Sequence, residues 1–124
     1  LGDEIFLDAM RTVHERYARR LMSTADFLDV IREAGGEAGR VEATINFVGY
    51  SLIEAERLDD AREVFELNTR LFPEAFNTWD SLGEIHMTLG HDTKAIRFYE
   101  RSLELNPDNR GAKRVLEEAG ATVP

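Results

Sequence analysis

The sequence repeats itself every 34 residues, and this register restricts the fold more than any other feature of the chain. When the chain is compared with itself after that shift, glycine falls on glycine, proline on proline and one aromatic ring on another. The coinciding pairs are Gly49 and Gly83, Ala61 and Ala95, Leu71 and Leu105, Pro73 and Pro107, Phe65 and Tyr99, and Val48 and Leu82. A period of this length is typical of short structural units that bury their apolar faces against their neighbours. The sequence therefore predicts two units, residues 42–75 and 76–109.

Each unit is predicted to consist of two helices, because apolar residues recur in both halves at steps that place them on one helical face. In the first unit the two faces are formed by Ile45, Val48, Gly49 and Leu52, and by Ala61, Val64, Phe65 and Leu71. In the second unit they are formed by Trp79, Leu82, Ile85 and Leu89, and by Ala95, Ile96, Tyr99 and Leu103. Pro73 and Pro107 follow the second helix of each unit and prevent its continuation.

Residues that favour helix ends lie beside these faces. The polar side chains that can cap a helix start are Asn77 or Thr78, Asp92 or Thr93, and, for a last helix after the second proline, Asp108 or Asn109. Gly90 is placed to close a helix in the left-handed conformation. The first unit has Glu56 at that place, where the left-handed conformation costs roughly 1 kcal/mol. This turn is therefore expected either to bear that cost or to adopt another shape.

Further helices are predicted on both sides of the repeats. Residues 1–40 read as a helix pair, with one apolar stripe of Phe6, Met10, Val13, Tyr17 and Leu21 and a second helix buried through Phe27, Leu28 and Ile31. Gly35–Gly39 is the glycine-rich linker between this pair and the repeats. Residues 110–124 are predicted as a capping helix and a tail, because Ala112, Val115, Leu116 and Ala119 form a single apolar face before Gly120. The chain is thus predicted to be all-α, with seven helices.

The composition restricts the partners of such a protein. Among 124 residues, 24 acidic side chains outnumber 15 basic ones, and the formal net charge is −9. This charge repels phosphate backbones and anionic lipid, so no nucleic-acid or membrane partner is expected. There is no cysteine, no apolar run approaches the ~20 residues of a membrane helix, and the first residues do not resemble a signal peptide. A cytoplasmic location is the expectation.

The second unit resembles the tetratricopeptide repeat. The residues that carry the resemblance are Trp79, Leu82, Gly83, Ala95, Tyr99 and Pro107. The first unit is a weaker copy, since Ile45 stands at the place of the tryptophan, and Leu52 and His86 both stand where the family pattern has tyrosine. The resemblance implies a right-handed α-solenoid, in which small residues let two helices cross closely and rings fill the space around the crossing.

The repeats are also similar to tetratricopeptide segments that follow serine hydrolases of the penicillin-binding or esterase type. This similarity is carried by Gly49 and Tyr50, by residues 65–68, by Phe72 and Pro73, and by residues 80–84. It implies an accessory or oligomerisation segment of a hydrolase whose catalytic domain is too large for this chain to contain.

Catalytic and metal-binding patterns are missing from the sequence. None of its serines lies in a G-x-S-x-G or S-x-x-K pattern, and His14, His86 and His91 lack the spacing of H-E-x-x-H. His86 is expected to pack in place of a tyrosine, and His91 to lie exposed in a turn. The chain is therefore interpreted as a non-catalytic module, with no cofactor or metal expected.

A binding groove is implied by the resemblance, because the first helix of each unit lines the concave side of such a stack. The residues placed on this side are Asn46, Tyr50, Ile53, Glu54, Asp80, Glu84, Met87 and Thr88, followed by Arg114 from the capping helix. The carboxylates disfavour an anionic peptide, so the predicted partner is a protein or peptide of basic or apolar character. The alternative is that these residues are covered by the N-terminal helices or face water.

Two units and a cap fall short of the roughly three repeats that a stable stack needs. The N-terminal helices are therefore expected to supply a layer, either within the chain or by exchange across Gly35–Gly39 in a swapped homodimer. The leading interpretation is a protein-interaction module that holds a peptide or helix, with self-association as an option. The alternative is the hydrolase appendage.

Overall fold

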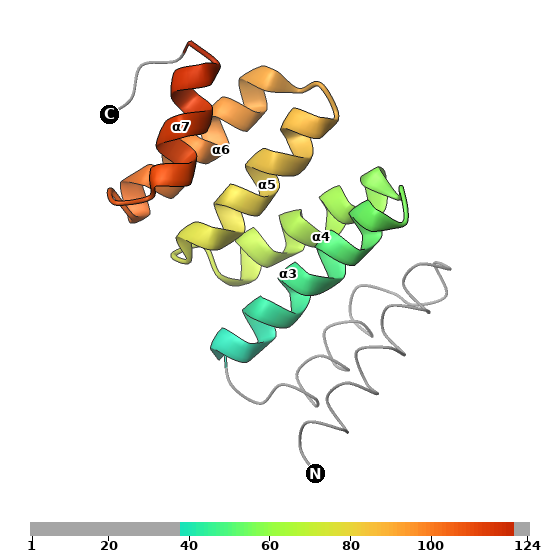
Figure 1. The fold of residues 1–124 in the computed structure, drawn as a ribbon. Helices are drawn as coiled ribbons and strands as arrows, with labels where there is room; N and C mark the ends of the chain where they lie inside the picture. Colours follow the sequence, from blue (N-terminus) through green and yellow to red (C-terminus); the bar gives the residue numbers. More distant parts are fainter. Residues whose placement is uncertain (1–37, 121–124) are drawn as a thin grey trace. The chain divides into compact units, whose positions relative to one another are not determined.

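The structure, a computed structural model, describes residues 38–120, and its regular elements are helices. Their bounds are α3 Ala38–Glu54, α4 Leu58–Leu71, α5 Phe76–Thr88, α6 Asp92–Leu105 and α7 Arg110–Glu118 (Figure 1). No strand occurs in these residues, so the prediction of an all-α helical repeat is confirmed. The predicted N-terminal helix pair and its exchange between chains lie outside the described residues. Because α3 begins at Ala38, the last two residues of the predicted glycine-rich linker are helical.

The chain divides into two compact bodies, and the boundary between Val64 and Phe65 lies within α4. The described part of the first body consists of α3, the turn that follows it and the start of α4. The apolar stripes predicted for these helices are buried: Ile45, Val48, Gly49 and Leu52 of α3, and Ala61 and Val64 of α4. The steps of three and four residues therefore identify the buried face of this body correctly.

The turn after α3 adopts the left-handed conformation in spite of its charged residue. Glu56 has a φ of 60°, its N–H donates to the Ile53 carbonyl at 2.9 Å, and the N–H of Arg57 donates to the Leu52 carbonyl at 2.8 Å. These two bonds form the Schellman arrangement, which satisfies carbonyls at the end of the helix. Of the two expected outcomes for this turn, the retained left-handed shape is the one that occurs.

The turn after α5 has the same hydrogen bonds one period later. Gly90 has a φ of 81°, its N–H donates to the Met87 carbonyl at 3.1 Å, and the N–H of His91 donates to the His86 carbonyl at 2.8 Å. The predicted role of Gly90 is confirmed. The 34-residue register thus extends from side chains to backbone hydrogen bonds.

In the second compact body, α6 packs against both α5 and α7 (Figure 1). The approach of α5 to α6 is closest at Gly83, where a Cβ atom would lie 2.9 Å from both Cδ2 and Cε2 of Tyr99. The ring of Tyr99 is only 7% exposed. This confirms that the small residue at 83 is required by the crossing of two helices beside an aromatic ring.

The last helix covers one side of α6 with an apolar face. Tyr99 and Leu103 of α6 form a buried cluster with Ala112 and Leu116 of α7. The start of α7 is capped by Asn109, whose Oδ1 accepts a hydrogen bond from the N–H of Ala112 at 3.2 Å. Asn109 is thus the cap among the two predicted candidates, and Gly120 follows the helix with a φ of 74°.

The predicted caps of α5 and α6 are wrong. The N-cap residues are Ala75 and His91, and neither makes a side-chain capping bond. Thr78 is buried in the first turn of α5, where its hydroxyl donates to the Ala75 carbonyl at 2.8 Å. Asp92 is the first residue of α6, where its charge favours the positive end of the helix dipole.

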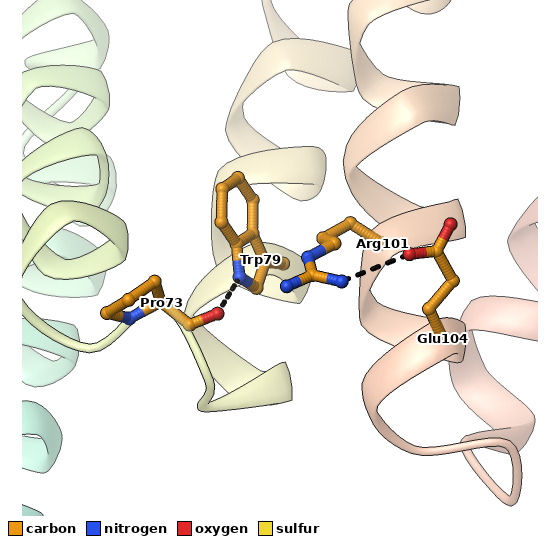
Figure 2. A network of polar contacts seen from close by, with 4 residues as sticks. All are labelled: Pro73, Trp79, Arg101 and Glu104. Carbon is orange, nitrogen blue, oxygen red and sulfur yellow. Dashed lines mark hydrogen bonds and ion pairs between the residues drawn. The ribbon is translucent and has the colours of Figure 1, made fainter.

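Trp79 lies at the edge of the α5–α6 contact and is half-buried. Its Nε1 donates a hydrogen bond to the Pro73 carbonyl at 2.8 Å, which ties α5 to the turn before it (Figure 2). Its ring stacks on that of Phe98, with the ring centroids 6.0 Å apart. Trp79 therefore packs on a second ring of α6, while Leu82 and Ile85 of its predicted stripe are fully enclosed.

Candidate protein-binding faces

The predicted binding residues of α3 lie beside its buried stripe. Asn46, Tyr50 and Ile53 are half-buried, and Glu54 is exposed at the end of the helix. Tyr50 follows Asn46 by four residues, and Ile53 and Glu54 follow Tyr50 by three and four, so these residues share one side of α3. This side offers an amide, a phenol, an aliphatic chain and a carboxylate.

Phe47 is the residue of α3 that the sequence interpretation missed. It is 60% exposed, the largest exposed fraction among the bulky apolar side chains of residues 38–120. It lies next to Asn46 and one turn before Tyr50, so it extends the predicted face with an aromatic ring. The sequence holds a signal for it, because Phe47 falls off the stripe of Ile45 and Val48 and aligns with the small Ser81 one period later.

The predicted residues of the second unit are not equally accessible. Glu84 and Thr88 of α5 and Arg114 of α7 are exposed. Met87 is half-buried and packs against the cluster shared by α6 and α7. The exposed part of the α5 face is therefore polar, and the thioether of Met87 lies at the edge of the core.

Asp80 has a partner within the protein. Its Oδ2 accepts a hydrogen bond from Nδ2 of Asn109 at 3.0 Å, and the same Nδ2 donates to Oγ of Ser102 at 3.0 Å. The Ser102 hydroxyl in turn donates to the Phe76 carbonyl at 3.0 Å. Oδ1 of Asp80 is buried and has no hydrogen-bond partner among the described residues. This carboxylate therefore links α5 to the start of α7.

Four aromatic rings follow one another along the contact between α5 and α6, ending at the turn that joins them. Trp79 stacks on Phe98, Phe98 lies 5.2 Å from the ring of His86, and His86 lies 5.2 Å from the ring of His91. His86 is buried and His91 is exposed, as predicted from the sequence. The ring series runs from the start of α5 to its end.

Two ion pairs of the described residues are local. Arg57 binds Asp60 at 2.6 Å, and Arg101 binds Glu104 at 3.1 Å (Figure 2). Each pair spans a separation of three residues within or next to one helix, so it supports that helix rather than a binding site. Residues 38–120 contain no group of three or more His, Cys, Asp or Glu side chains arranged around a common point for a metal ion. None of the helices in this range is long and apolar enough to cross a membrane.

Successive helices, with Schellman turns after α3 and α5 whose hydrogen bonds recur after 34 residues, are typical of helical-repeat proteins. Residues 76–109 match the family model of the tetratricopeptide repeat. The matched range has the same bounds as the second unit predicted from the sequence, and it supports assignment of this unit to that family. Tetratricopeptide repeats generally mediate protein–protein interactions and are typically non-catalytic. No curated protein matches the chain at a significant level.

Proposed function

We propose that the chain is a non-catalytic interaction module whose α3 and α5 faces each contact a protein or peptide of basic or apolar character. The observation that carries the proposal is the tetratricopeptide match over residues 76–109, which contain α5 and α6. The resemblance to the tetratricopeptide repeat implies that the first helix of each unit lines the concave, ligand-binding side of the stack.

The chemistry of the two faces supports a partner with apolar and basic groups. On α3, Phe47, Tyr50 and Ile53 offer apolar surface, and the exposed Glu54 offers a negative charge. On α5 the exposed Glu84 offers another carboxylate. Aromatic side chains anchor interfaces with little loss of conformational entropy, and acidic groups around them favour a cationic partner through long-range attraction.

The charge of the α5 face is tested with defined peptides. Two helical peptides of equal length, one with leucine and lysine and the other with leucine and glutamate, are titrated against the full chain by fluorescence anisotropy. The basic peptide is expected to bind. Glu84→Lys is expected to lower the affinity for this peptide by up to about fivefold at low salt, which is about what an exposed ion pair contributes. The difference should shrink as ionic strength rises.

Glu117→Lys is the matched control, because it makes the same charge change at an exposed site of α7. Asp80 is left unchanged, since its bond to Asn109 holds the start of α7 and its loss would affect folding. Equal weakening by both variants, or equal binding of the two peptides, would contradict the proposed face.

A second candidate function is that of an accessory or oligomerisation segment beside a serine hydrolase. It is supported by the sequence similarity of Gly49 and Tyr50, of residues 65–68 and of residues 80–84 to segments of that kind. Reading the gene upstream of Leu1 tests it: an open frame that continues into a serine-hydrolase motif favours the appendage, and a start codon beside Leu1 favours the independent module. Light scattering of the purified chain separates a monomer from the proposed swapped homodimer.

A further inference from the structure

The turn between α5 and α6 brings two histidine side chains together. Nδ1 of His86 and Nδ1 of His91 lie 3.0 Å apart, and their ring planes are tilted by 40°. The backbone is the cause, because the Schellman bond from the His91 N–H to the His86 carbonyl folds the two residues onto each other. The turn after α3 has the same bond between Leu52 and Arg57, neither of which can form such a pair.

The protein holds the two rings next to each other. His86 is 3% exposed and lies against the ring of Phe98, which fixes its orientation. His91 is held at the start of α6, where its carbonyl accepts the N–H of Ala95 at 3.0 Å, and its side chain is exposed to solvent. A ligand therefore meets one nitrogen fixed in the protein and a second one at the surface.

Two imidazole nitrogens at this separation match the needs of a transition-metal ion. With metal–nitrogen bonds of about 2.0–2.1 Å, nitrogen atoms 3.0 Å apart subtend an angle of about 91–97° at the ion. That angle joins neighbouring positions of a square-planar or octahedral ion, the geometry favoured by Cu²⁺ and Ni²⁺. In the present contact one Nδ1 donates its hydrogen to the other. Binding an ion requires the exposed His91 ring to turn, so that both Nδ1 lone pairs converge on the ion instead of facing each other, and to carry its hydrogen on Nε2.

The geometry points to a two-histidine site for a divalent transition-metal ion at the end of α5, with Cu²⁺ bound more tightly than Ni²⁺ or Zn²⁺. No third side chain of the described residues completes the set, so water occupies the remaining positions. The affinity is accordingly well below that of a structural zinc site with four protein ligands. A bound ion ties the end of α5 to the start of α6, and it stabilises this hairpin by an amount that rises with the logarithm of the free ion concentration above the Kd.

Titration of Cu²⁺ into the purified full chain, followed by electron paramagnetic resonance, tests the site. One equivalent is expected to give a spectrum with two nitrogen donors, and the melting temperature should rise in parallel. His91→Gln should reduce the spectrum to at most one nitrogen donor and remove the thermal shift, while circular dichroism shows an intact fold, since this side chain is exposed.

His14→Gln is the matched control, because it removes the chain's third histidine and leaves the pair intact. It should bind Cu²⁺ as the unchanged chain does. The inference is overturned if His91→Gln keeps two nitrogen donors, if His14→Gln loses one, or if the unchanged chain binds no Cu²⁺ at one equivalent.

Discussion

Gly83 and Tyr99 make the contact that most tightly limits side-chain size in the second unit. The two residues coincide with Gly49 and Phe65 one period earlier, and this coincidence allowed the close crossing to be predicted from the sequence. The distance itself depends on how α5 settles against α6, which no local pattern specifies. At 2.9 Å from two ring atoms, even a methyl group has no room at position 83, because packed interiors leave few voids.

Gly83→Ala is expected to destabilise the chain by roughly 1–3 kcal/mol, the usual penalty for overpacking a core. Gly111→Ala is the control, because Gly111 lies on the exposed side of α7 and an added Cβ would meet only Oδ1 of Asn109 at 3.5 Å. This second substitution should stabilise the chain by up to ~1 kcal/mol, since alanine has a higher helix propensity than glycine. Urea denaturation measures both, and a Gly83→Ala variant as stable as the parent would contradict the close crossing.

Asp80 illustrates where prediction of the candidate site from sequence ends. Its position on the predicted face of α5 follows from helical spacing, and so do the positions of Glu84 and Thr88. Its partner Asn109 lies 29 residues further along the chain and reaches it only after α6 has folded back. Non-local hydrogen bonds of this kind have no local sequence signal.

At the scale of elements, the helices and their buried stripes were predictable, whereas two of the helix starts were not. Thr78 is a good capping residue by type, but Pro73 and the turn around it bring the carbonyls of Phe72 and Ala75 close to its hydroxyl. The hydroxyl therefore donates to these carbonyls, and α5 begins at Phe76. The repeated turns are the opposite case, because the same short-range bonds close α3 and α5 although glycine occupies only one of them.

The turns allow a paired test of left-handed strain. Glu56→Asn should stabilise the chain by up to ~1 kcal/mol, because asparagine tolerates positive φ better than glutamate does. Gly90→Ala should destabilise it by about 1 kcal/mol, and this cost is purely one of backbone conformation, since no heavy atom lies within 4 Å of an added Cβ. Thermal and urea denaturation give both values. A stabilising effect of Gly90→Ala would show that the two turns do not share one conformation in solution.

At the scale of the whole molecule, the 34-residue register predicts that each helix is stabilised mainly by packing against its neighbours rather than by one central core. The buried cluster of α6 and α7 contains Leu116, which has no exposed surface, and the half-buried Val115 packs at its edge. The net charge of −9 adds a diffuse repulsion that no single helix relieves. Local packing against the adjacent helix must therefore hold each element in place.

Leu116→Ala tests this view of the whole molecule. Removing a fully buried leucine is expected to cost about 2–5 kcal/mol, and the loss should appear first as faster amide hydrogen exchange in α6 and α7, while α3 keeps its protection. Val115→Ala, one residue earlier and half-buried, should produce the same pattern with a smaller amplitude. If α3 lost protection to the same extent as α6 and α7, the chain would unfold as a single cooperative body, and the nearest-neighbour account of its repeats would be wrong.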